Sequence, residues 1–207
     1  MKKMLAIGGK AAASGGNVMV VEDGTLPSAY RKLAGIIFDG DVVYDTGMRL
    51  DGGDTVKISF KVTKACNIFG CYTTATDADN YSLYLSTSRT AKYMRYGSGT
   101  YNSVFSSNTR YDVTITPKGT RGFPTNSTWS PGAFTTSVNM LIGSTSYGAT
   151  SAKLTGEVYG AIEIVNKRRY FPVERVSDGE IGYYDIFTET FLENQGTGTP
   201  LAIELDS

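Results

Sequence analysis

The fold of this chain is decided by the stretch Tyr170-Phe-Pro-Val-Glu-Arg-Val-Ser-Asp-Gly-Glu-Ile-Gly-Tyr-Tyr-Asp-Ile-Phe-Thr-Glu-Thr-Phe-Leu-Glu-Asn-Gln-Gly-Thr-Gly-Thr199. Asp178-Gly179 lies between two short apolar stretches, and this pair predicts a tight hairpin turn. Three short pieces follow it: Gly182-Tyr-Tyr-Asp185, Phe191-Leu-Glu-Asn194 and the turn Gly196-Thr-Gly-Thr199. We interpret the stretch as the closing strands of a β-sandwich, in which Asp178, Asp185 and Asn194 shape turns and sheet.

The preceding residues supply the other strands of an all-β domain. Residues 55–62 alternate, so Val56, Ile58, Phe60 and Val62 face one side of a half-buried antiparallel strand. Residues 81–85 and 111–115 repeat this alternation. Further strands are predicted at residues 138–143, 154–165 and 170–173, and a hairpin is predicted over residues 36–44 with Asp39-Gly40 as its two-residue turn.

The length and composition fit one large domain preceded by a short arm. The chain has 207 residues, and its 24 glycines and 14 tyrosines suit many short strands and tight turns. Residues 1–25 form the Gly- and Ala-rich arm, which we expect to be mobile or to dock on a partner; residues 17–22 within it could form one strand. Residues 26–207 form the β-domain.

Charge and hydropathy argue against two classes of partner. Basic and acidic residues balance at 20 each, so no net field attracts nucleic acid or anionic lipid. The single basic run, Lys167-Arg-Arg169, lacks interleaved aromatics and is interpreted as blunting an edge strand. No apolar run is long enough to span a membrane, and the apolar part of residues 1–10 is too short for an export signal. We therefore expect no membrane insertion.

The absence of histidine removes the usual general base and the commonest metal ligand. Cys66 and Cys71 are the only cysteines, and two thiols without other ligands cannot form a structural zinc site. One interpretation is that they form a local disulfide. The other is that they are two small, semi-buried side chains. We expect no cofactor.

Several segments resemble one family of phage modules. Leu26-Pro-Ser-Ala-Tyr30 with Asp45-Thr-Gly47 is similar to the opening of a concanavalin-A-like, laminin-G-like jelly-roll module of tailed phages and prophages of gut bacteria. The terminal signature is matched by Gly179-Glu-Ile-Gly-Tyr-Tyr-Asp185 with Asn194-Gln-Gly-Thr-Gly198. Phe38-Asp-Gly-Asp-Val42 departs from the Ser-Thr-Gly-Thr-Gln character of the family. Internal strands are matched by Ile68-Phe-Gly70, Tyr81-Ser-Leu-Tyr84, Met140-Leu-Ile-Gly143 and Leu154-Thr-Gly-Glu-Val-Tyr159.

The resemblance covers about residues 26–203 and implies a fold and a setting. The implied fold is a jelly roll of two antiparallel sheets, one of them concave. The implied setting is a surface-displayed virion protein, made in the host cytoplasm, oligomeric in the particle and binding host or mucosal carbohydrate without catalysis. The alternative is a capsid decoration, head-fibre or tail component that serves assembly, with residues 1–25 contacting other virion proteins. Because the architecture also carries hydrolases, function has to be argued from a site.

Aromatic side chains are the candidate glycan ligands, because lectin-like sheets stack aromatic faces on apolar sugar faces. Tyr81 and Tyr84 lie on opposite faces of their strand, so only one of them can reach a shared groove. Trp129 lies in a polar loop, where tryptophan is exposed more often than in a strand. The candidate ligand residues are Tyr84, Tyr93, Tyr96, Tyr101 and Trp129, although any single tyrosine can equally pack the sheets.

Acidic residues offer weaker candidates for catalysis or metal binding. A retaining glycosidase needs two carboxylates about 5–5.5 Å apart. Glu157 and Glu163 share a predicted strand but are six residues apart, and both are expected to face solvent. For calcium, the candidates are Asp77, Asp79 and Asn80, followed by Asp51 and Asp54, and an ordinary polar turn explains both sets as well.

Overall fold

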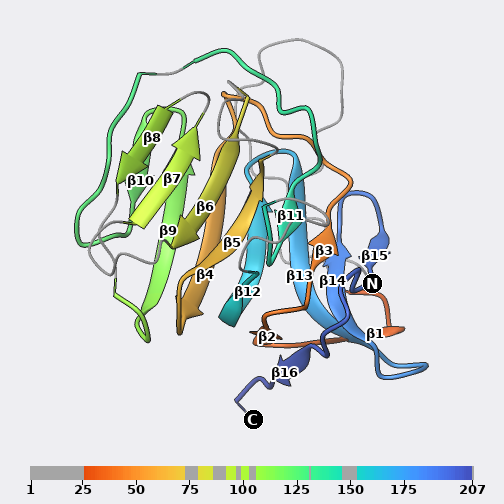
Figure 1. Ribbon diagram of the computed structural model, residues 1–207. Helices are drawn as coiled ribbons and strands as arrows, with labels where there is room; N and C mark the ends of the chain where they lie inside the picture. Colours follow the sequence, from red (N-terminus) through yellow and green to blue (C-terminus); the bar gives the residue numbers. More distant parts are fainter. Residues whose placement is uncertain are drawn as a thin grey trace, which may run out of the picture.

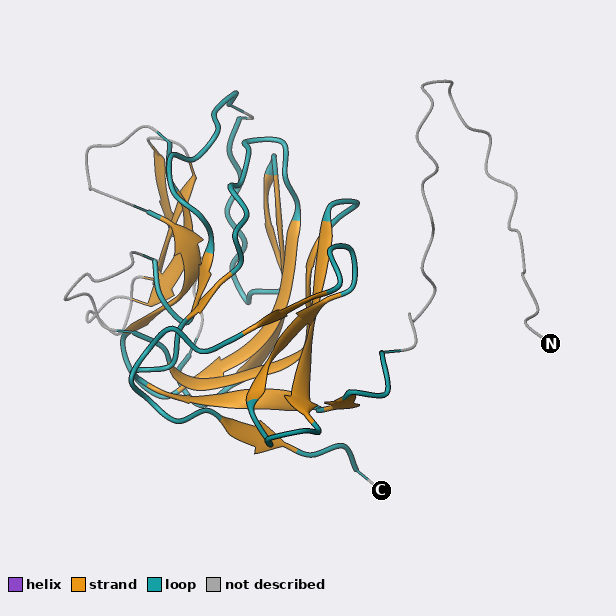
Figure 2. Ribbon diagram, turned by 90° about the vertical axis from the view of Figure 1, so that its right-hand side faces the viewer, coloured by secondary structure: helices purple, strands orange, loops and turns teal. Residues whose placement is uncertain are grey.

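The computed structural model of the chain describes residues 26–72, 79–85, 92–96, 99–102, 106–130, 132–145 and 153–206. These residues form only strands and loops (Figure 2), and they contain no helix that is long and apolar enough to cross a membrane. The strands make two antiparallel sheets, one of ten strands and one of six (Figure 1). The predicted all-β class and the two-sheet arrangement are confirmed. The arm at residues 1–25 lies outside the described residues.

The larger sheet runs in the order β10-β9-β4-β12-β13-β14-β15, with β1 paired to β13 and β2 paired to both β12 and β16. Its strands are β1 (Tyr30–Lys32), β2 (Gly35–Asp39), β4 (Val56–Val62), β9 (Arg110–Thr116), β10 (Gly119–Arg121), β12 (Thr155–Ile164), β13 (Arg168–Arg175), β14 (Ile181–Asp185), β15 (Thr190–Leu192) and β16 (Leu201–Ile203). The smaller sheet has the order β3-β11-β5-β6-β7-β8. Its strands are β3 (Tyr44–Asp45), β5 (Cys66–Cys71), β6 (Tyr81–Leu85), β7 (Lys92–Tyr96), β8 (Gly99–Asn102) and β11 (Leu141–Ile142).

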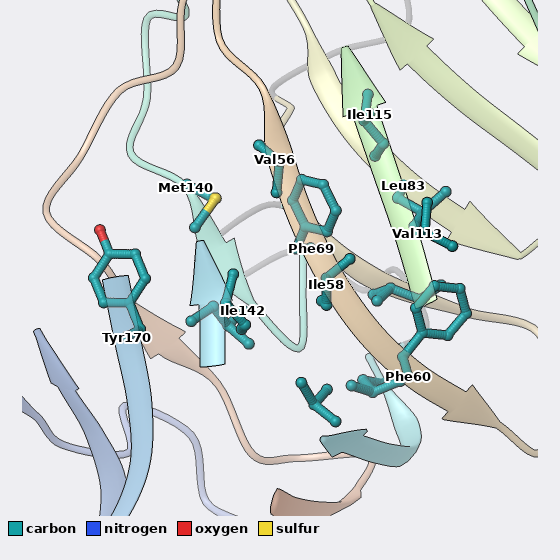
Figure 3. Packing of buried hydrophobic residues seen from close by; sticks show 14 of the residues in the cluster. Val56, Ile58, Phe60, Phe69, Leu83, Val113, Ile115, Met140, Ile142 and Tyr170 are labelled. Carbon is teal, nitrogen blue, oxygen red and sulfur yellow. The ribbon is translucent and has the colours of Figure 1, made fainter. Parts of the chain in front are cut away.

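The hydrophobic core lies between the two sheets. The alternation predicted for β4 is confirmed, because Val56, Ile58, Phe60 and Val62 are all buried. They meet inward residues of β9 and of the smaller sheet, including Phe69, Leu83 and Ile142 in the same cluster (Figure 3). Burying such large side chains contributes about 1.5–3 kcal/mol each. This shared core is what holds the sheets face to face as a sandwich.

The closing stretch forms the predicted hairpin and extends it by one strand. β13 pairs with β14 and β14 with β15, in the order expected from the sequence. The turn is closed by a hydrogen bond from Arg175 N to Glu180 O, and Gly179 takes a positive φ of 75° within it. Asp185 Oδ1 accepts from Phe187 N in the next turn. Asp178 and Asp185 are therefore turn-forming residues, as predicted.

Asn194 ties the end of the chain to the smaller sheet. Its Oδ1 accepts hydrogen bonds from Val43 N at 2.9 Å and from Gly196 N at 2.9 Å, and its Nδ2 donates to Gly198 O. The side chain thus provides hydrogen-bond partners for backbone groups that this irregular segment would otherwise leave unsatisfied. It fixes the Gly-rich turn against the start of β3.

The predicted hairpin over residues 36–44 is wrong. β2 pairs with β12 and β16 in the larger sheet, whereas β3 pairs with β11 in the smaller one. The Asp39-Gly40 turn therefore carries the chain from one sheet to the other. Val42, Val43 and Tyr44 are buried in succession, so this segment lacks the alternation of a hairpin strand lying on one sheet. The predicted strand at residues 138–143 is also shorter than expected, since only β11 is regular.

A second, smaller hydrophobic cluster covers the outer face of the larger sheet. Phe171, Val173 and Tyr184 are buried there, on the face opposite the main core. Leu26 and Tyr30 pack on them from the start of the β-domain, and the Tyr30 ring lies 4.7 Å from that of Tyr184. The first residues of the domain are thereby fixed across β13 and β14.

The two cysteines are buried and unbonded to each other. Cys66 and Cys71 begin and end β5, and they occupy register positions opposite Leu85 and Tyr81. Six residues of an extended strand keep them too far apart for a disulfide. Burial raises the pKa of each thiol to about 11. The structure therefore supports the interpretation of both cysteines as small packed side chains, and they are buried more deeply than expected.

Candidate functional site

Two loops that are far apart in the sequence lie side by side at the edge of the smaller sheet. Residues 45–54, between β3 and β4, lie antiparallel to residues 133–141, which lead into β11. Thr46 N donates to Met140 O at 3.1 Å, Met140 N to Met48 O at 2.7 Å, and Gly52 N to Phe134 O at 2.8 Å. The buried Thr46 hydroxyl also donates to Met140 O. These bonds make a rigid ribbon from segments with no regular strand pattern.

A pocket of about 410 Å³ opens where this ribbon meets the smaller sheet. We call it the edge pocket. Its lining residues are Asp45, Arg49, Tyr72, Val138, Asn139, Leu141 and Thr145. Neighbouring residues Tyr44 and Ile142 belong to the core, so Asp45 and Leu141 lie on the opposite, outer face of the sheet. The pocket therefore combines carboxylate, guanidinium and amide groups with apolar surface.

The acidic side of the pocket is held in place by the local fold. Asp45 Oδ1 accepts from Gly47 N at 2.8 Å, and Gly47 has the positive φ of 65° that this tight turn requires. Asp45 Oδ2 accepts from Asn139 Nδ2 at 3.4 Å across the ribbon. The carboxylate and the amide are thus oriented together before any ligand arrives.

Arg49 provides the positive charge of the pocket. Its side chain is exposed, and within the described part of the chain it makes no hydrogen bond or ion pair with another residue. A guanidinium carries five donors in a planar fork that suits carboxylate-like acceptors. An anionic group of a ligand can therefore bind to Arg49. Asp45 can accept hydrogen bonds from the ligand, and the amide of Asn139 can both donate and accept them.

A second, shallower hollow lies farther along the ribbon. It has a volume of about 520 Å³ and is lined by Asp51, Gly52, Gly53, Ala133, Phe134 and Thr135. Asp51 accepts a hydrogen bond from Thr135 Oγ1 at 2.7 Å and forms an ion pair with Lys167 at 2.9 Å. These two contacts lower the pKa of Asp51. Its carboxylate is already committed to the fold.

The calcium candidates lie in this loop and at residues 77–80. Asp54, which is buried, accepts from Asp51 N at 2.8 Å and from the Lys167 ammonium at 2.6 Å. Asp51 and Asp54 thus share a lysine, whose ammonium group supplies the positive charge that a metal ion would otherwise bring. Asp77 lies outside the described residues, whereas Asp79 is exposed and Asn80 is buried. The described part of the chain holds no group of three or more His, Cys, Asp or Glu side chains arranged to bind a metal ion.

The carboxylates weighed for hydrolysis lie on the outer face of the larger sheet, and each has a lysine partner. Glu157 pairs with Lys61 at 2.7 Å, and Glu163 with Lys57 at 2.8 Å. Tyr159 also donates to Glu157. We call this region the ion-paired face, and it comprises Lys57, Lys61, Arg110, Glu157, Tyr159 and Glu163.

Arg110 completes the ion-paired face. Its Nε donates to Ser59 Oγ at 3.0 Å, and its guanidinium lies 4.4 Å from the centre of the Tyr159 ring. Burial opposes the ionisation of Glu157, but hydrogen bonds from Lys61 and Tyr159 outweigh it and lower the pKa of Glu157. The face is a network of mutually satisfied charges.

Of the tyrosines chosen from the sequence, Tyr84 can be placed most fully. Tyr81 is buried in the core and Tyr84 is half-buried on the outer face, so the prediction that they lie on opposite faces is confirmed. In the backbone register, Tyr93 lies opposite Tyr84, Tyr96 opposite Tyr81, and Tyr101 opposite Met94. The side chains of Tyr93, Tyr96 and Tyr101 lie outside the described part of the structure.

The expectation that Trp129 is exposed is wrong. Trp129 is only 8% exposed and belongs to the main core. Its loop folds back on β10, with a bridge between Gly119 and Thr128 and a hydrogen bond from Trp129 N to Lys118 O at 3.2 Å. This return brings the indole under the sheet, where its large apolar surface is removed from water. Trp129 therefore cannot stack on a ligand.

The basic run does not blunt an edge strand either, because β13 has neighbours on both sides. Lys167 binds Asp51 and Asp54, as described above. Arg168 Nε pairs with the buried Asp185 at 3.1 Å, and the Arg169 guanidinium lies 4.8 Å from the Phe171 ring centre. Each of the three charges has a structural partner within the same domain.

The edge pocket was missed by sequence reasoning because its described lining residues come from three separate segments, residues 45–49, 72 and 138–145. One weak signal was available: Asp45-Thr-Gly47 has the composition of a tight turn directly after a buried run. No family model matches the chain, and no curated protein sequence matches it. The case for a function therefore rests on the geometry of this pocket.

Proposed function

We propose that this protein is a non-catalytic, surface-displayed virion protein that binds carbohydrate through the edge pocket. The observation that carries the proposal is the pocket itself. It places planar polar groups, from Asp45, Arg49 and Asn139, beside apolar surface from the half-buried Tyr72 and Val138. Sugars present hydroxyls around their rim and apolar C–H faces, so they need this mixture of ligands.

The proposed architecture is a concanavalin-like jelly roll. Two antiparallel sheets that share one core support this, as does the order of the last three strands of the chain. The resemblance of residues 26–203 to phage modules supplies the setting: a particle surface, an oligomeric assembly and a host or mucosal glycan as target. The edge pocket supplies the place where such a glycan would bind.

The non-catalytic part of the proposal draws on the acidic side chains. Glu157 and Glu163 are each bound by a lysine, and Asp45 is bound by a backbone amide and by Asn139. A glycosidase would need one protonated and one free carboxylate on either side of a bond. Incubation with mixed polysaccharides, followed by a reducing-end assay, tests this point, and release of reducing ends would contradict it.

A glycan array probed with the full chain tests carbohydrate binding. We expect selective retention on a subset of glycans, and the Tyr72→Ala variant should bind about tenfold more weakly, the equivalent of about 1.4 kcal/mol. Phe187→Ala is the matched control, because Phe187 is an exposed aromatic residue in the β14–β15 turn and is not among the residues that line the pocket. Tyr84→Ala tests the sheet face predicted from the sequence. A flat array for the wild-type chain would refute the proposal.

A second candidate function is assembly into the particle without glycan binding. It is favoured by the place where the β-domain begins: Leu26 and Tyr30 pack on the outer face of β13 and β14. Val176 follows β13 in the chain and Phe187 follows β14, and these two apolar side chains are 63% and 48% exposed in their turns. Apolar groups exposed at such turns are suited to a protein interface.

Deletion of residues 1–25 separates the two candidates. If the arm anchors the protein, the shortened chain should fail to enter particles and should still bind any glycan that the intact chain binds. Normal incorporation of the shortened chain would eliminate the anchoring role. Circular dichroism and thermal unfolding of the shortened chain provide the folding control.

A further inference from the structure

Building on the proposed carbohydrate binding, we propose that the edge pocket selects an acidic sugar, one whose carboxylate or sulfate group binds to the guanidinium of Arg49. The inference deepens the proposed function, because it names the chemical class of the glycan. It is carried by three features of the pocket: an arginine with no counter-ion among the described residues, a carboxylate that is already oriented, and apolar surface beside them.

The first feature is the state of Arg49 compared with other arginines of the domain. Arg31, Arg168 and Arg175 each contact at least one carboxylate, and Arg175 contacts three. Arg49 and Arg121 contact none within the described residues, and of these two Arg49 lines the edge pocket, together with Asp45. A guanidinium that is not engaged in the fold keeps its paired donors available for a planar anion.

The second feature is that Asp45 does not neutralise Arg49. The Asp45 oxygens are turned toward Gly47 N and Asn139 Nδ2, at 2.8 and 3.4 Å. The two charges of the pocket therefore stand apart, without the short contact that would define an ion pair. A ligand can meet a donor fork at Arg49 and an acceptor with spare lone pairs at Asp45.

The third feature is the apolar surface that lines the pocket together with these charges. Val138 and Tyr72, which are both half-buried, supply it, whereas Leu141 is only 3% exposed. A sugar ring that lays its C–H face on this surface leaves its hydroxyls to Asp45 and Asn139. An acidic substituent at the rim of the ring would then extend to the exposed Arg49.

The same features disfavour a phosphate-rich ligand. Nucleic acids and polyphosphates are held by several cations, whereas the described lining contains one arginine and one carboxylate. Asp45 repels a multiply charged chain, and the protein has no net charge to attract one. A sugar with one acidic group matches the one guanidinium of the described lining.

The test uses the full chain and a glycan array in which neutral oligosaccharides are printed beside their sialylated, uronic-acid and sulfated counterparts. We expect retention on acidic members over the matching neutral ones, with the carboxylated and sulfated arms identifying which anion is preferred. Binding should weaken as salt concentration rises, because the contact is ionic and exposed. The affinity for the best acidic glycan should then be measured by calorimetry.

Arg49→Gln should lower that affinity about tenfold or more, since it removes a charged, bidentate donor. Arg49→Lys keeps the charge but not the fork, and should recover part of the loss. Arg121→Gln is the matched control, because Arg121 is an exposed arginine on β10 in the other sheet. Thermal unfolding of each variant checks the fold, and the Arg49→Lys variant decides the case if Arg49→Gln is unstable.

The possible results separate the inference from the function on which it rests. Equal binding of neutral and acidic glycans, unchanged in Arg49→Gln, would overturn the acidic preference and leave carbohydrate binding standing. Loss of acidic binding in Arg121→Gln as well would also overturn it, since the effect would then be one of general charge. No binding to any glycan would refute the proposed function itself.

Discussion

The ion-paired face of the larger sheet and the edge pocket of the smaller one use charged residues in opposite ways. On the ion-paired face, Glu157 and Glu163 each bind a lysine, and Arg110 lies over Tyr159. In the edge pocket, Arg49 has no counter-ion within the described residues. Both regions are polar and open to solvent, so surface polarity alone does not distinguish them. The difference is that the charges of the ion-paired face are satisfied within the fold, whereas the edge pocket leaves the Arg49 guanidinium available to a ligand.

The largest expected effect comes from the sheet beside the pocket. Gly70 lies opposite Leu141 in the register, and a Cβ built on it would lie 2.4 Å from Ser82 Cβ. Gly70→Ala should therefore lower the free energy of unfolding by about 3 kcal/mol, because neither backbone can move away. Urea denaturation measures this change.

The control for that variant is Gly53→Ala, in the loop that leads away from the pocket. A Cβ at Gly53 would meet no atom within 4 Å. We expect a change of less than about 0.5 kcal/mol. If Gly70→Ala proved as mild as its control, the tight contact between β5 and β6 would be wrong, and so would the pocket wall built on it.

A smaller effect is expected on the ion-paired face. Glu157→Ala leaves the Lys61 ammonium and the Tyr159 hydroxyl without their shared acceptor. We expect a loss of about 1 kcal/mol, and a double-mutant cycle with Lys61→Ala should give a coupling of about 0.5–1 kcal/mol. Strict additivity of the two substitutions would show that the pair does not contribute to stability, which would weaken the contrast with the edge pocket.

The same pair predicts a dependence on pH. The pKa of Glu157 is lowered from its ordinary value of 4.5 in the folded protein. Its contribution is therefore fully present above pH 4.5 and is lost as the pH falls through the lower folded value. The stability difference between the wild-type chain and Glu157→Gln should shrink over that range when both are unfolded in urea. A difference that stayed constant down to pH 3 would contradict the shift.

The smallest expected effect is at Arg49. Because Arg49 has no partner within the described residues, Arg49→Gln should change the free energy of unfolding by less than about 0.5 kcal/mol. Urea denaturation of this variant beside Glu157→Ala compares the two regions directly. A loss at Arg49 as large as that at Glu157 would mean that the arginine serves the fold, and the contrast would disappear.

The strands could be predicted from the sequence where burial alternates locally. β4 and β9 show this, and so does the closing set β13 to β15, where turn residues mark each end. Local alternation could not decide whether residues 36–44 form a hairpin. A Gly-containing turn looks the same whether the chain returns to its own sheet or crosses to the other. That choice depends on distant partners, β12 for β2 and β11 for β3.

The site was harder to predict for a related reason. Asp45 and Asn139 meet only because two irregular segments pair through backbone hydrogen bonds. Trp129 failed as a candidate because loop composition says nothing about whether a loop folds back under a sheet. Tyr84 was placed on the correct face because alternation along one strand is a local property. Local alternation therefore predicts on which face of a strand a residue lies, whereas the position of the pocket depends on pairing between residues that are far apart in the sequence.

The pairing of β2 has a consequence for how this protein is made. β2 pairs with β12 and β16, so every strand partner of Ile36 and Phe38 is synthesised more than a hundred residues later. A ribosome must release most of the chain before these apolar side chains can be covered. Pairing of β2 is thus deferred until β12 and β16 have been synthesised, and chains stalled before that point should be prone to aggregate or to require chaperones.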